Sequence, residues 1–249
     1  INVAAKFPNV KFEHATGYKT SDNMGNYFGA AEEGRYLSGM AAGARSESGT
    51  IGYVAAFPIP EVLRGINAFT LGAREINPEA TVQVVWTSTW FDPPTEGDAA
   101  QALLDAGADV IAMHQDSSAP GQAAEAAGAG WVGYNTDMSE FAPEGWLTAA
   151  IWDWGPYYLA TAEAVQAGTW APQAYYGTMA DGMVAIAPFG PSVTEETQAL
   201  IAERQAQIID GSFAVFPDPI VNQAGNEQPL GDIFSMDYFV EGVIGSPSG

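Results

Sequence analysis

Four clusters of aromatic and polar residues each follow an apolar run that has the length of a buried strand. They are Trp90-Phe91-Asp92, His114-Gln115-Asp116-Ser117, Tyr134-Asn135 with Asp137, and Trp152-Asp153-Trp154. Aromatic faces stack on flat molecules, whereas carboxylates and amides form hydrogen bonds at the edge of a ring. The four clusters therefore favour the binding of a small, planar, polar molecule.

Catalysis by a relay of Ser117, His114 and Asp116 is not favoured. A nucleophile must contact a base that an acid orients, and neighbours on one loop rarely achieve that geometry. The chain also lacks the Gly-x-Ser-x-Gly elbow of many hydrolases. One enzymatic alternative stays open, a nucleoside or sugar hydrolase that uses paired carboxylates such as Asp92 and Asp116.

Metal, thiol and phosphate chemistry are each disfavoured by composition. The two histidines, His14 and His114, are far apart in the sequence, and there is no cysteine. No Gly-x-Gly-x-x-Gly turn follows a predicted strand, and there is no P-loop. We therefore expect no metal and no cofactor.

The charge of the chain excludes further classes of partner. Eight Lys and Arg against 30 Asp and Glu give a formal net charge of -22. Nucleic acids and anionic membrane surfaces are bound by clustered cations, so neither is an expected partner. No apolar run is long enough to cross a membrane.

Strand-like and helix-like segments alternate along the chain, with strands roughly 25–30 residues apart. Strands are expected at 10–15, 51–57, 82–86, 109–113, 130–134, 147–152 and 182–187, and helices at 30–44, 61–76, 95–106, 121–127, 156–167 and 194–210. This order is typical of α/β folds with parallel sheets flanked by helices. Ligands of such sheets bind beyond the carboxyl ends of the strands, where the four clusters lie.

The first residues look like the last turns of a helix that has been cut. Ile1 is not a methionine, and Pro8 closes the segment 1–7. We therefore expect that an amino-terminal portion is missing, so the lack of a signal peptide says nothing about export.

Long stretches of the chain resemble one family of solute receptors. They are AAKFPNVKFEHATGY, EEGRYLSGMAAG, IGYVAAFPIPEVLRGINAFTLGAREINP, WTSTWFDPPTEGDAAQALLDAGADVI and DGMVAIAPFG. In order, they resemble the basic membrane protein family, the receptors of ABC importers that include the purine nucleoside receptors. The resemblance covers nearly the whole chain.

The resemblance implies a two-lobed type I periplasmic-binding-protein fold that closes on a ligand between its lobes. Residues 1–46 with 154–175 would form lobe one, whose amino-terminal part would be missing, and 47–153 with 176–249 would form lobe two. The implied partners are a small ligand and an ABC permease. The implied location is the periplasm or the cell surface, with a lipid anchor on the missing segment as one option.

Two stretches, HQDSSAP and IWDWGPYY, look like a subgroup associated with purine bases such as adenine. Ala149 to Trp152 replace a Ser-x-x-Lys-like stretch, and the loss of its lysine weakens the expectation of ribose recognition. By position, Trp90 would stack on the base, Asp116, Asn135 and Asp153 would contact its polar edge, and Phe57 would line the hinge-side wall. The full set of expected ligand contacts is Phe57, Trp90, Phe91, His114, Asp116, Asn135, Asp137, Asp153 and Trp154.

The sequence thus predicts a non-catalytic receptor for a purine base or nucleoside. Two alternatives remain at this point. One is the hydrolase with paired carboxylates, and the other is a ligand-sensing regulatory protein of the same fold.

Overall fold

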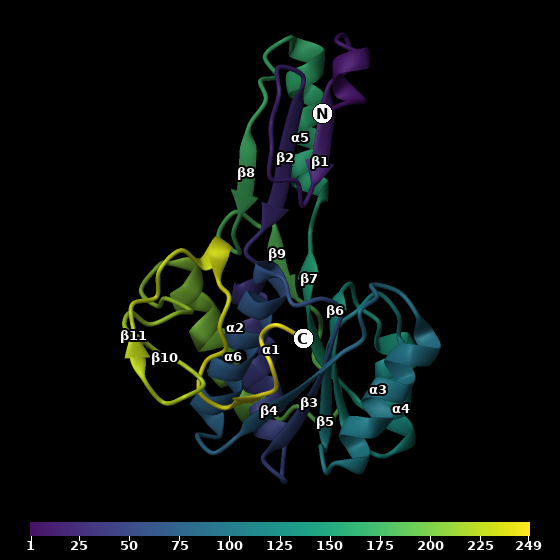
Figure 1. Ribbon diagram of the computed structural model, residues 1–249, viewed down its shortest axis with the longest axis vertical. Helices are drawn as coiled ribbons and strands as arrows, with labels where there is room; N and C mark the ends of the chain where they lie inside the picture. Colours follow the sequence, from purple (N-terminus) through teal and green to yellow (C-terminus); the bar gives the residue numbers. More distant parts are fainter. The chain divides into compact units, whose positions relative to one another are not determined.

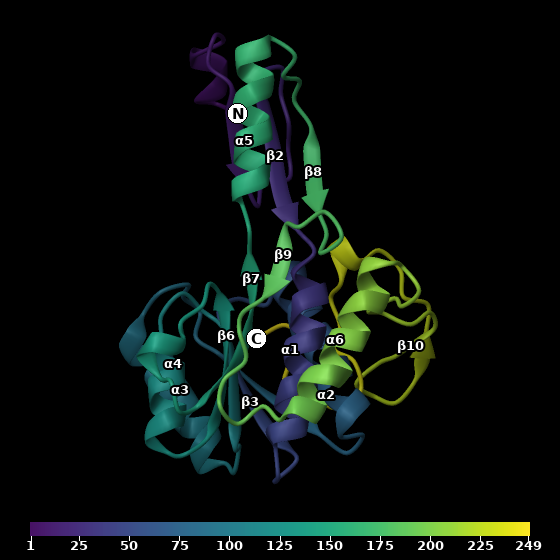
Figure 2. The ribbon, with the colours of Figure 1, turned by 180° about the vertical axis from the view of Figure 1, so that it is seen from behind.

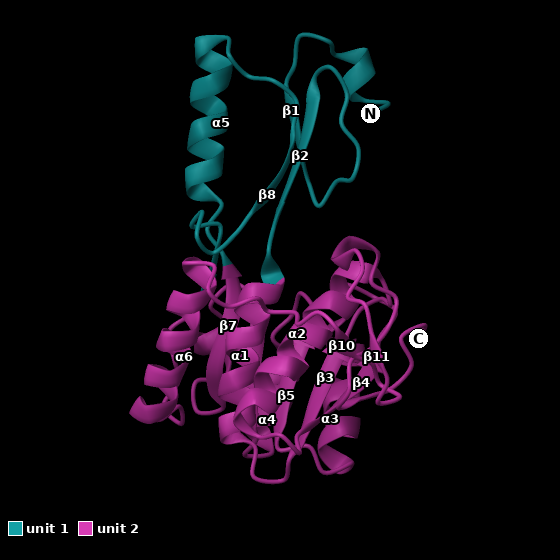
Figure 3. Cartoon of the chain, turned by 90° about the vertical axis from the view of Figure 1, so that its left-hand side faces the viewer, with its two compact units in different colours: residues 1–31, 152–185 teal, residues 32–151, 186–249 magenta.

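The computed structural model describes residues 1–249, which form two compact units (Figure 3). Unit 1 comprises Ile1–Ala31 and Trp152–Ala185, and unit 2 comprises Glu32–Ile151 and Ile186–Gly249. The chain passes between the units at the start of helix α1, at the end of strand β7 and within strand β9.

Unit 1 is a small parallel sheet with one long helix on its face (Figure 3). The strand order is β1-β2-β8, with β1 at Phe12–Ala15, β2 at Met24–Gly29 and β8 at Ala174–Gly177. The helix α5 spans Gly155–Ala167 and ends at Gly168, whose φ of 70° suits the left-handed cap that glycine adopts readily. A 3₁₀ turn, η1 at Ala4–Lys6, precedes β1.

Unit 2 is built on a sheet with strand order β12-β4-β3-β5-β6-β7-β9. The central strands β3, β4, β5 and β6 are parallel to their neighbours. The bounds of the seven strands are Thr50–Ala55 for β3, Thr81–Trp86 for β4, Val110–His114 for β5, Gly130–Asn135 for β6, Trp146–Trp152 for β7, Val184–Ile186 for β9 and Val243–Ile244 for β12.

Helices cover both faces of this sheet (Figure 1; Figure 2 shows the reverse view). One group comprises α1 (Ala31–Arg45), α2 (Pro60–Ile76) and α6 (Glu195–Ile209), and the other comprises α3 (Pro93–Asp105) and α4 (Ala119–Ala126). Two 3₁₀ turns, η2 (Ser139–Phe141) and η3 (Ile233–Ser235), and the short pair β10 (Ile220–Val221) and β11 (Glu227–Gln228) complete the unit. None of the helices combines the length and the apolar character needed to cross a membrane.

The α/β class predicted from the sequence is confirmed, but two strands of unit 1 were missed. The segment that contains Gly25 and Asn26 is not among the predicted strands, yet it forms β2, the central strand of unit 1. Glycine and asparagine are poor strand formers, so only pairing with a neighbour on each side makes this strand stable. The strand β8 was missed as well, and the opening helix turns are a single 3₁₀ turn.

The compact units also have other boundaries than the lobes expected from the sequence. Residues 32–46 pack with unit 2 because α1 lies directly against α2, whereas 176–185 pack with unit 1 because β8 pairs with β2. The contact boundaries therefore follow backbone pairing and helix packing, which a linear pattern of residues does not reveal.

Glycines allow α1 and α2 to approach so closely. A Cβ at Gly39 of α1 would lie 2.1 Å from the carbonyl oxygen of Phe69, and one at Gly72 of α2 would lie 2.0 Å from that of Tyr36. Neither backbone can move away without opening the core, because Leu37 and Phe69 are fully buried beside this contact. The spacing of α1 and α2 thus depends on residues without side chains.

We expect Gly39→Ala to destabilise the protein by about 3 kcal/mol, because the new methyl group overlaps the backbone of α2. Gly97→Ala in α3 is the matched control, since its Cβ would lie 3.8 Å from the nearest atom, on Ala119. Its better helix propensity should stabilise the protein by up to about 1 kcal/mol. Urea unfolding of both variants measures the difference, and a similar small effect of the two would contradict this account of the packing.

Candidate functional site

The parallel register of unit 2 brings the carboxyl ends of four strands together. Ala55 at the end of β3 pairs with Trp86 at the end of β4 and with His114 at the end of β5. Strand β6 lies beside β5 and ends at Asn135. Three of the four clusters recognised in the sequence therefore meet at one edge of this sheet.

Aromatic rings form a continuous group at this edge, which we call the strand-end aromatic cluster (Phe57, Trp90, His114 and Tyr134). The ring centroid of Trp90 lies 5.2 Å from that of Phe57 and 6.1 Å from that of His114, and the His114 and Tyr134 centroids are 4.2 Å apart. Trp90 remains 40% exposed, whereas His114 is only 2% exposed. Trp90 thus packs against the rings of Phe57 and His114 and still has exposed surface that a ligand can contact.

Hydrogen-bonding groups lie next to this cluster. The side chain of Asn135 donates to Oδ1 of Asp116 at 2.9 Å, and the backbone N–H of Asp116 donates to the carbonyl oxygen of Trp90 at 3.1 Å. Asn135 has a φ of 68°, a left-handed conformation that asparagine tolerates better than most residues. This turn aims the amide at Asp116, which is exposed to solvent.

The surroundings of Asp116 disfavour the ionised form of its carboxyl group. Burial of part of the group and the neighbouring Glu96 carboxylate raise its pKa, and the hydrogen bond from Asn135 opposes that shift. A ligand that donates an N–H or O–H to Asp116 would stabilise the ionised form. The carboxylate is therefore prepared to accept a hydrogen bond.

Three of the predicted residues, Phe91, Asp116 and Asp137, line a pocket of about 550 Å³ in unit 2. The other side chains that line it include Gln122, Glu140 and Phe141. Phe91 is 64% exposed, and Asp137 accepts the backbone N–H of Ser139 at 2.9 Å. The pocket, here named the strand-end pocket, has the size of common small-molecule sites.

His114 is placed differently from the other predicted contacts, because it lies beneath the surface. Its Nε2 is 3.7 Å from Oε1 of Glu61, its Nδ1 has no hydrogen-bond partner, and burial lowers its pKa to about 4 against the opposing effect of Glu61. The neutral, buried ring packs against Trp90, and its predicted contact with a ligand stays a prediction.

Asp153 and Trp154 belong to unit 1 and have neighbours of their own. Asp153 accepts the backbone N–H of Gly155 at 3.1 Å, at the start of α5. The Trp154 ring stacks on Trp152 at 4.8 Å and meets the edge of Tyr27 at 5.4 Å. The structure thus brings seven of the nine predicted contacts together in unit 2 and places these two in unit 1.

Several polar residues at this edge were missed from the sequence. Glu61, the residue after Pro60 in α2, lies next to His114, and the contact with His114 lowers its pKa although burial acts in the opposite direction. Arg35 of α1 is fully buried, with its guanidinium 3.8 Å from the Tyr134 ring centroid. The sequence did contain an indication that Arg35 is special. Before Arg45 at the end of α1, Arg35 is the one basic residue of the helix, and it lies among the apolar positions.

Asp92, one of the two carboxylates proposed for a hydrolase, has a structural role. Asp92 caps α3, because its side chain accepts the N–H of Thr95 at 3.3 Å, while buried Glu96 accepts the backbone N–H of Asp92 at 2.7 Å. Glu96 also accepts from the hydroxyl of Ser117. No group of three or more acidic or histidine side chains is arranged to hold a metal ion.

Comparisons with known proteins agree with this architecture. The family described as "ABC transporter substrate-binding protein PnrA-like" (Bmp) has a model that matches residues 1–214. The chain is 46% identical to a "Putative ABC transporter glucose-binding protein" of Haloferax volcanii over 98% of this chain, and 44% identical to a "Purine-binding protein" of Brucella abortus, also over 98%. It spans 61% of the length of the first relative and 71% of the second.

A solved solute-binding protein of an ABC transporter system from Aeropyrum pernix K1 has the same fold. It aligns with a TM-score of 0.73 at 16% identity, over 87% of this chain and 74% of the other. The type I periplasmic-binding-protein architecture expected from the sequence is thereby confirmed.

Stability should depend on pH through His114. The folded protein keeps His114 neutral down to about pH 4, whereas the unfolded chain protonates it near pH 6.5. Because the unfolded state alone takes up this proton, we expect the free energy of unfolding to fall by about 2 kcal/mol from pH 7 to pH 5.

Urea unfolding at both pH values tests this expectation. The variant His114→Gln should lose most of the pH dependence, and His14→Gln, which removes the only other histidine and an exposed one, should keep it. An unchanged slope in His114→Gln would show that another group is responsible.

Proposed function

The chain belongs to the PnrA-like family of ABC transporter substrate-binding proteins, and from that premise we propose that it is a receptor for a purine base such as adenine. Members of this family bind substrates outside the cytoplasm for an importer and are not enzymes. We infer that this chain delivers its ligand to an ABC permease. A lipid anchor is part of the same proposal, as is the use of the two compact units as the receptor's two lobes.

One observation carries the proposal, namely the exposed part of Trp90 beside the Asp116–Asn135 pair. Stacking of a base on an aromatic side chain contributes about 1–3 kcal/mol and needs no particular substituent on the base. The carboxylate of Asp116 and the amide of Asn135 then form hydrogen bonds with the edge of the base, where adenine has an amino group and ring nitrogens. Phe57 and His114 support the stacking ring of Trp90, and Phe91 and Asp137 line the adjoining pocket.

Charge supports a neutral or cationic ligand. All three lysines, Lys6, Lys11 and Lys19, belong to unit 1. Of the arginines in unit 2, Arg35 and Arg64 are buried, and Arg64 is paired with Glu32 at 3.1 Å. Phosphorylated nucleotides would find no accessible cation at the strand-end edge, so the free base suits the site better.

A monosaccharide is the second candidate, favoured by the relative from Haloferax volcanii that is described as glucose-binding. The apolar face of a sugar also packs on tryptophan, and its hydroxyl groups also donate to carboxylates. The predicted contributions of Asp153 and Trp154 to either ligand stay predictions.

A ligand panel decides between the two candidates. Adenine and other purine bases should raise the melting temperature of the natural protein, with a stabilisation of about 2.7 kcal/mol at a free concentration 100 times the dissociation constant. Glucose and other monosaccharides are measured in parallel by thermal shift and by calorimetry. If only the sugars give binding heat and thermal stabilisation, the ligand is a monosaccharide and not a purine. If no compound of the panel gives either, both candidates are rejected.

Within the site, Trp90→Ala should weaken binding of the identified base by about 10- to 100-fold, the equivalent of the stacking energy. Trp90→Phe keeps a stacking face and should recover most of the affinity. Tyr18→Ala, which removes an aromatic ring that is 85% exposed in unit 1, is the control and should bind normally. Isothermal titration calorimetry gives the affinities, and unchanged binding by Trp90→Ala would remove Trp90 from the site.

A further inference from the structure

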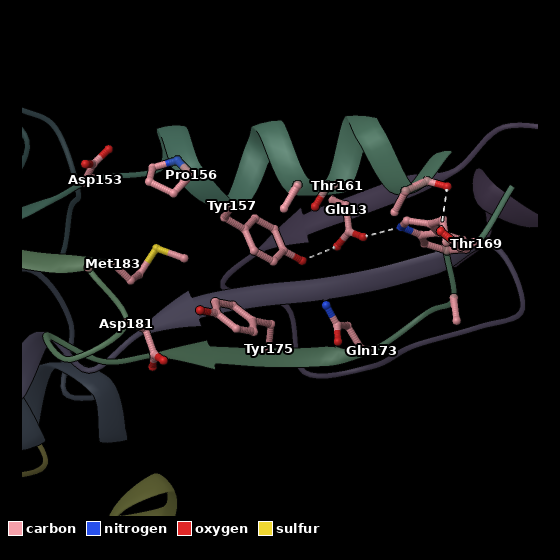
Figure 4. A pocket seen from close by; sticks show the side chains of 15 residues that line it. Glu13, Asp153, Pro156, Tyr157, Thr161, Thr169, Gln173, Tyr175, Asp181 and Met183 are labelled. Carbon is pink, nitrogen blue, oxygen red and sulfur yellow. Dashed lines mark hydrogen bonds between the residues drawn. The ribbon is translucent and has the colours of Figure 1, made fainter. Parts of the chain in front are cut away.

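Unit 1 contains a second pocket, of whose lining residues only Asp153 is among the predicted purine contacts (Figure 4). It measures about 450 Å³ and lies between the helix α5 and the strands β1 and β8. Helix α5 contributes Tyr157 and Thr161, β8 contributes Tyr175, and β1 contributes Glu13. Every residue that lines the pocket belongs to unit 1, so the pocket lies within that unit.

Glu13 is held in a fixed position at one end of the pocket. Its Oε2 accepts from the Tyr157 hydroxyl at 3.0 Å, and its Oε1 accepts from the indole N–H of Trp170 at 2.8 Å (Figure 4). The carboxylate lies over Gly25, where a Cβ would come within 2.7 Å of it. Burial and Glu13 raise the pKa of Tyr157 to about 12, so the hydroxyl stays protonated and continues to donate.

Both partners of Glu13 are neutral, so its negative charge is not compensated by an ion pair. Each carboxylate oxygen can accept more than one hydrogen bond, which leaves capacity for a further donor. Two more carboxylates, Asp153 and Asp181, line the opposite end (Figure 4). Neither lysine nor arginine lines the pocket.

The middle of the pocket is aromatic and apolar. The Tyr157 and Tyr175 rings stack with their centroids 4.8 Å apart, and Met183 and Ala160 add apolar surface. The ammonium group of Lys11 lies 4.9 Å from the Trp170 ring centroid. Aromatic rings with nearby carboxylates are the usual surroundings of an organic cation, because ring faces and carboxylates both attract positive charge.

From the carboxylates at opposite ends of the pocket and the apolar wall between them, we propose that this pocket binds a linear aliphatic diammonium ion. One ammonium group contacts Glu13, the other contacts Asp181 and Asp153, and the methylene chain packs along Tyr157 and Tyr175. The net charge of -22 raises the local concentration of such cations around the whole protein. Asp153 is the one residue that this site shares with the contacts predicted for the purine, and because Glu13 and Asp181 belong to this pocket alone, either proposal can be rejected without the other.

The test titrates the natural protein with 1,4-diaminobutane, 1-aminobutane and 1,4-butanediol by isothermal titration calorimetry. The diamine should bind with one-to-one stoichiometry and at least tenfold more tightly than the monoamine, and the uncharged diol should not bind. In the NMR spectrum, the indole resonance of Trp170, assigned with Trp170→Phe, should shift with the diamine. Equal affinities for diamine and monoamine would overturn the proposal that both ends are used.

Charge-removing variants locate the site. Asp181→Asn keeps an oxygen that can accept from Thr178, which Asp181 now holds through two hydrogen bonds, and should reduce diamine affinity to the monoamine level. Glu13→Gln should reduce the affinity for both amines at least tenfold. Glu163→Gln removes an equal charge from an exposed position of α5 outside the pocket and should have no effect.

Equal weakening in all three variants, or binding that disappears at 0.15 M salt in the unmodified protein, would show only diffuse attraction to an acidic surface and would overturn the site. Melting temperatures are recorded for each variant. If Glu13→Gln fails to fold, Asp181→Asn and the ligand series decide the question alone.

Discussion

The strand-end edge of unit 2 depends on one buried cation, the guanidinium of Arg35. A charge without solvent costs free energy unless neighbouring groups compensate for it. Here Nη1 donates to the carbonyl oxygen of Met113 at 2.8 Å, and the guanidinium carbon lies 3.8 Å from the Tyr134 ring centroid. Arg35 thereby fixes α1 against β5 and β6 at the depth where the aromatic cluster begins.

The properties of the cluster follow from that position. Burial, with a further contribution from the Arg35 charge, disfavours protonation of His114, so the ring stays neutral and packs against Tyr134 and Trp90. Glu61 has the opposite preference, because its contact with His114 and the positive charges of Arg64 and Arg35 lower its pKa against the effect of burial. The cations of this region lie beneath the surface, whereas Asp116 and Asp137 lie at the surface. Such an arrangement presents hydrogen-bond acceptors to a ligand and leaves the donors to be supplied by it.

The sequence was sufficient for the strands that end at this edge and for the polar residues beyond them. Val82 to Trp86 and Val110 to Met113 are mainly apolar runs that form the half-buried strand β4 and the buried strand β5, and parallel pairing places their ends on either side of the end of β3. The sequence could not show that His114 lies inward while Asp116 lies outward, because this depends on Arg35 and Tyr134, which come from distant segments. It also could not reveal β2, since Gly25 and Asn26 become a strand only through pairing on both sides.

Units 1 and 2 use the same chemical groups in different ways. In unit 2 the carboxylate Asp116 lies beside a partly exposed indole ring and an amide, a combination that fits the face and the edge of one flat molecule. In unit 1 the rings of Tyr157 and Tyr175 stack on each other, so the acids at the two ends are separated by an apolar wall. A flat molecule cannot insert between rings already in contact, whereas a flexible chain can lie along them. The mutual stacking of two tyrosines therefore determines the shape of ligand that unit 1 can accept.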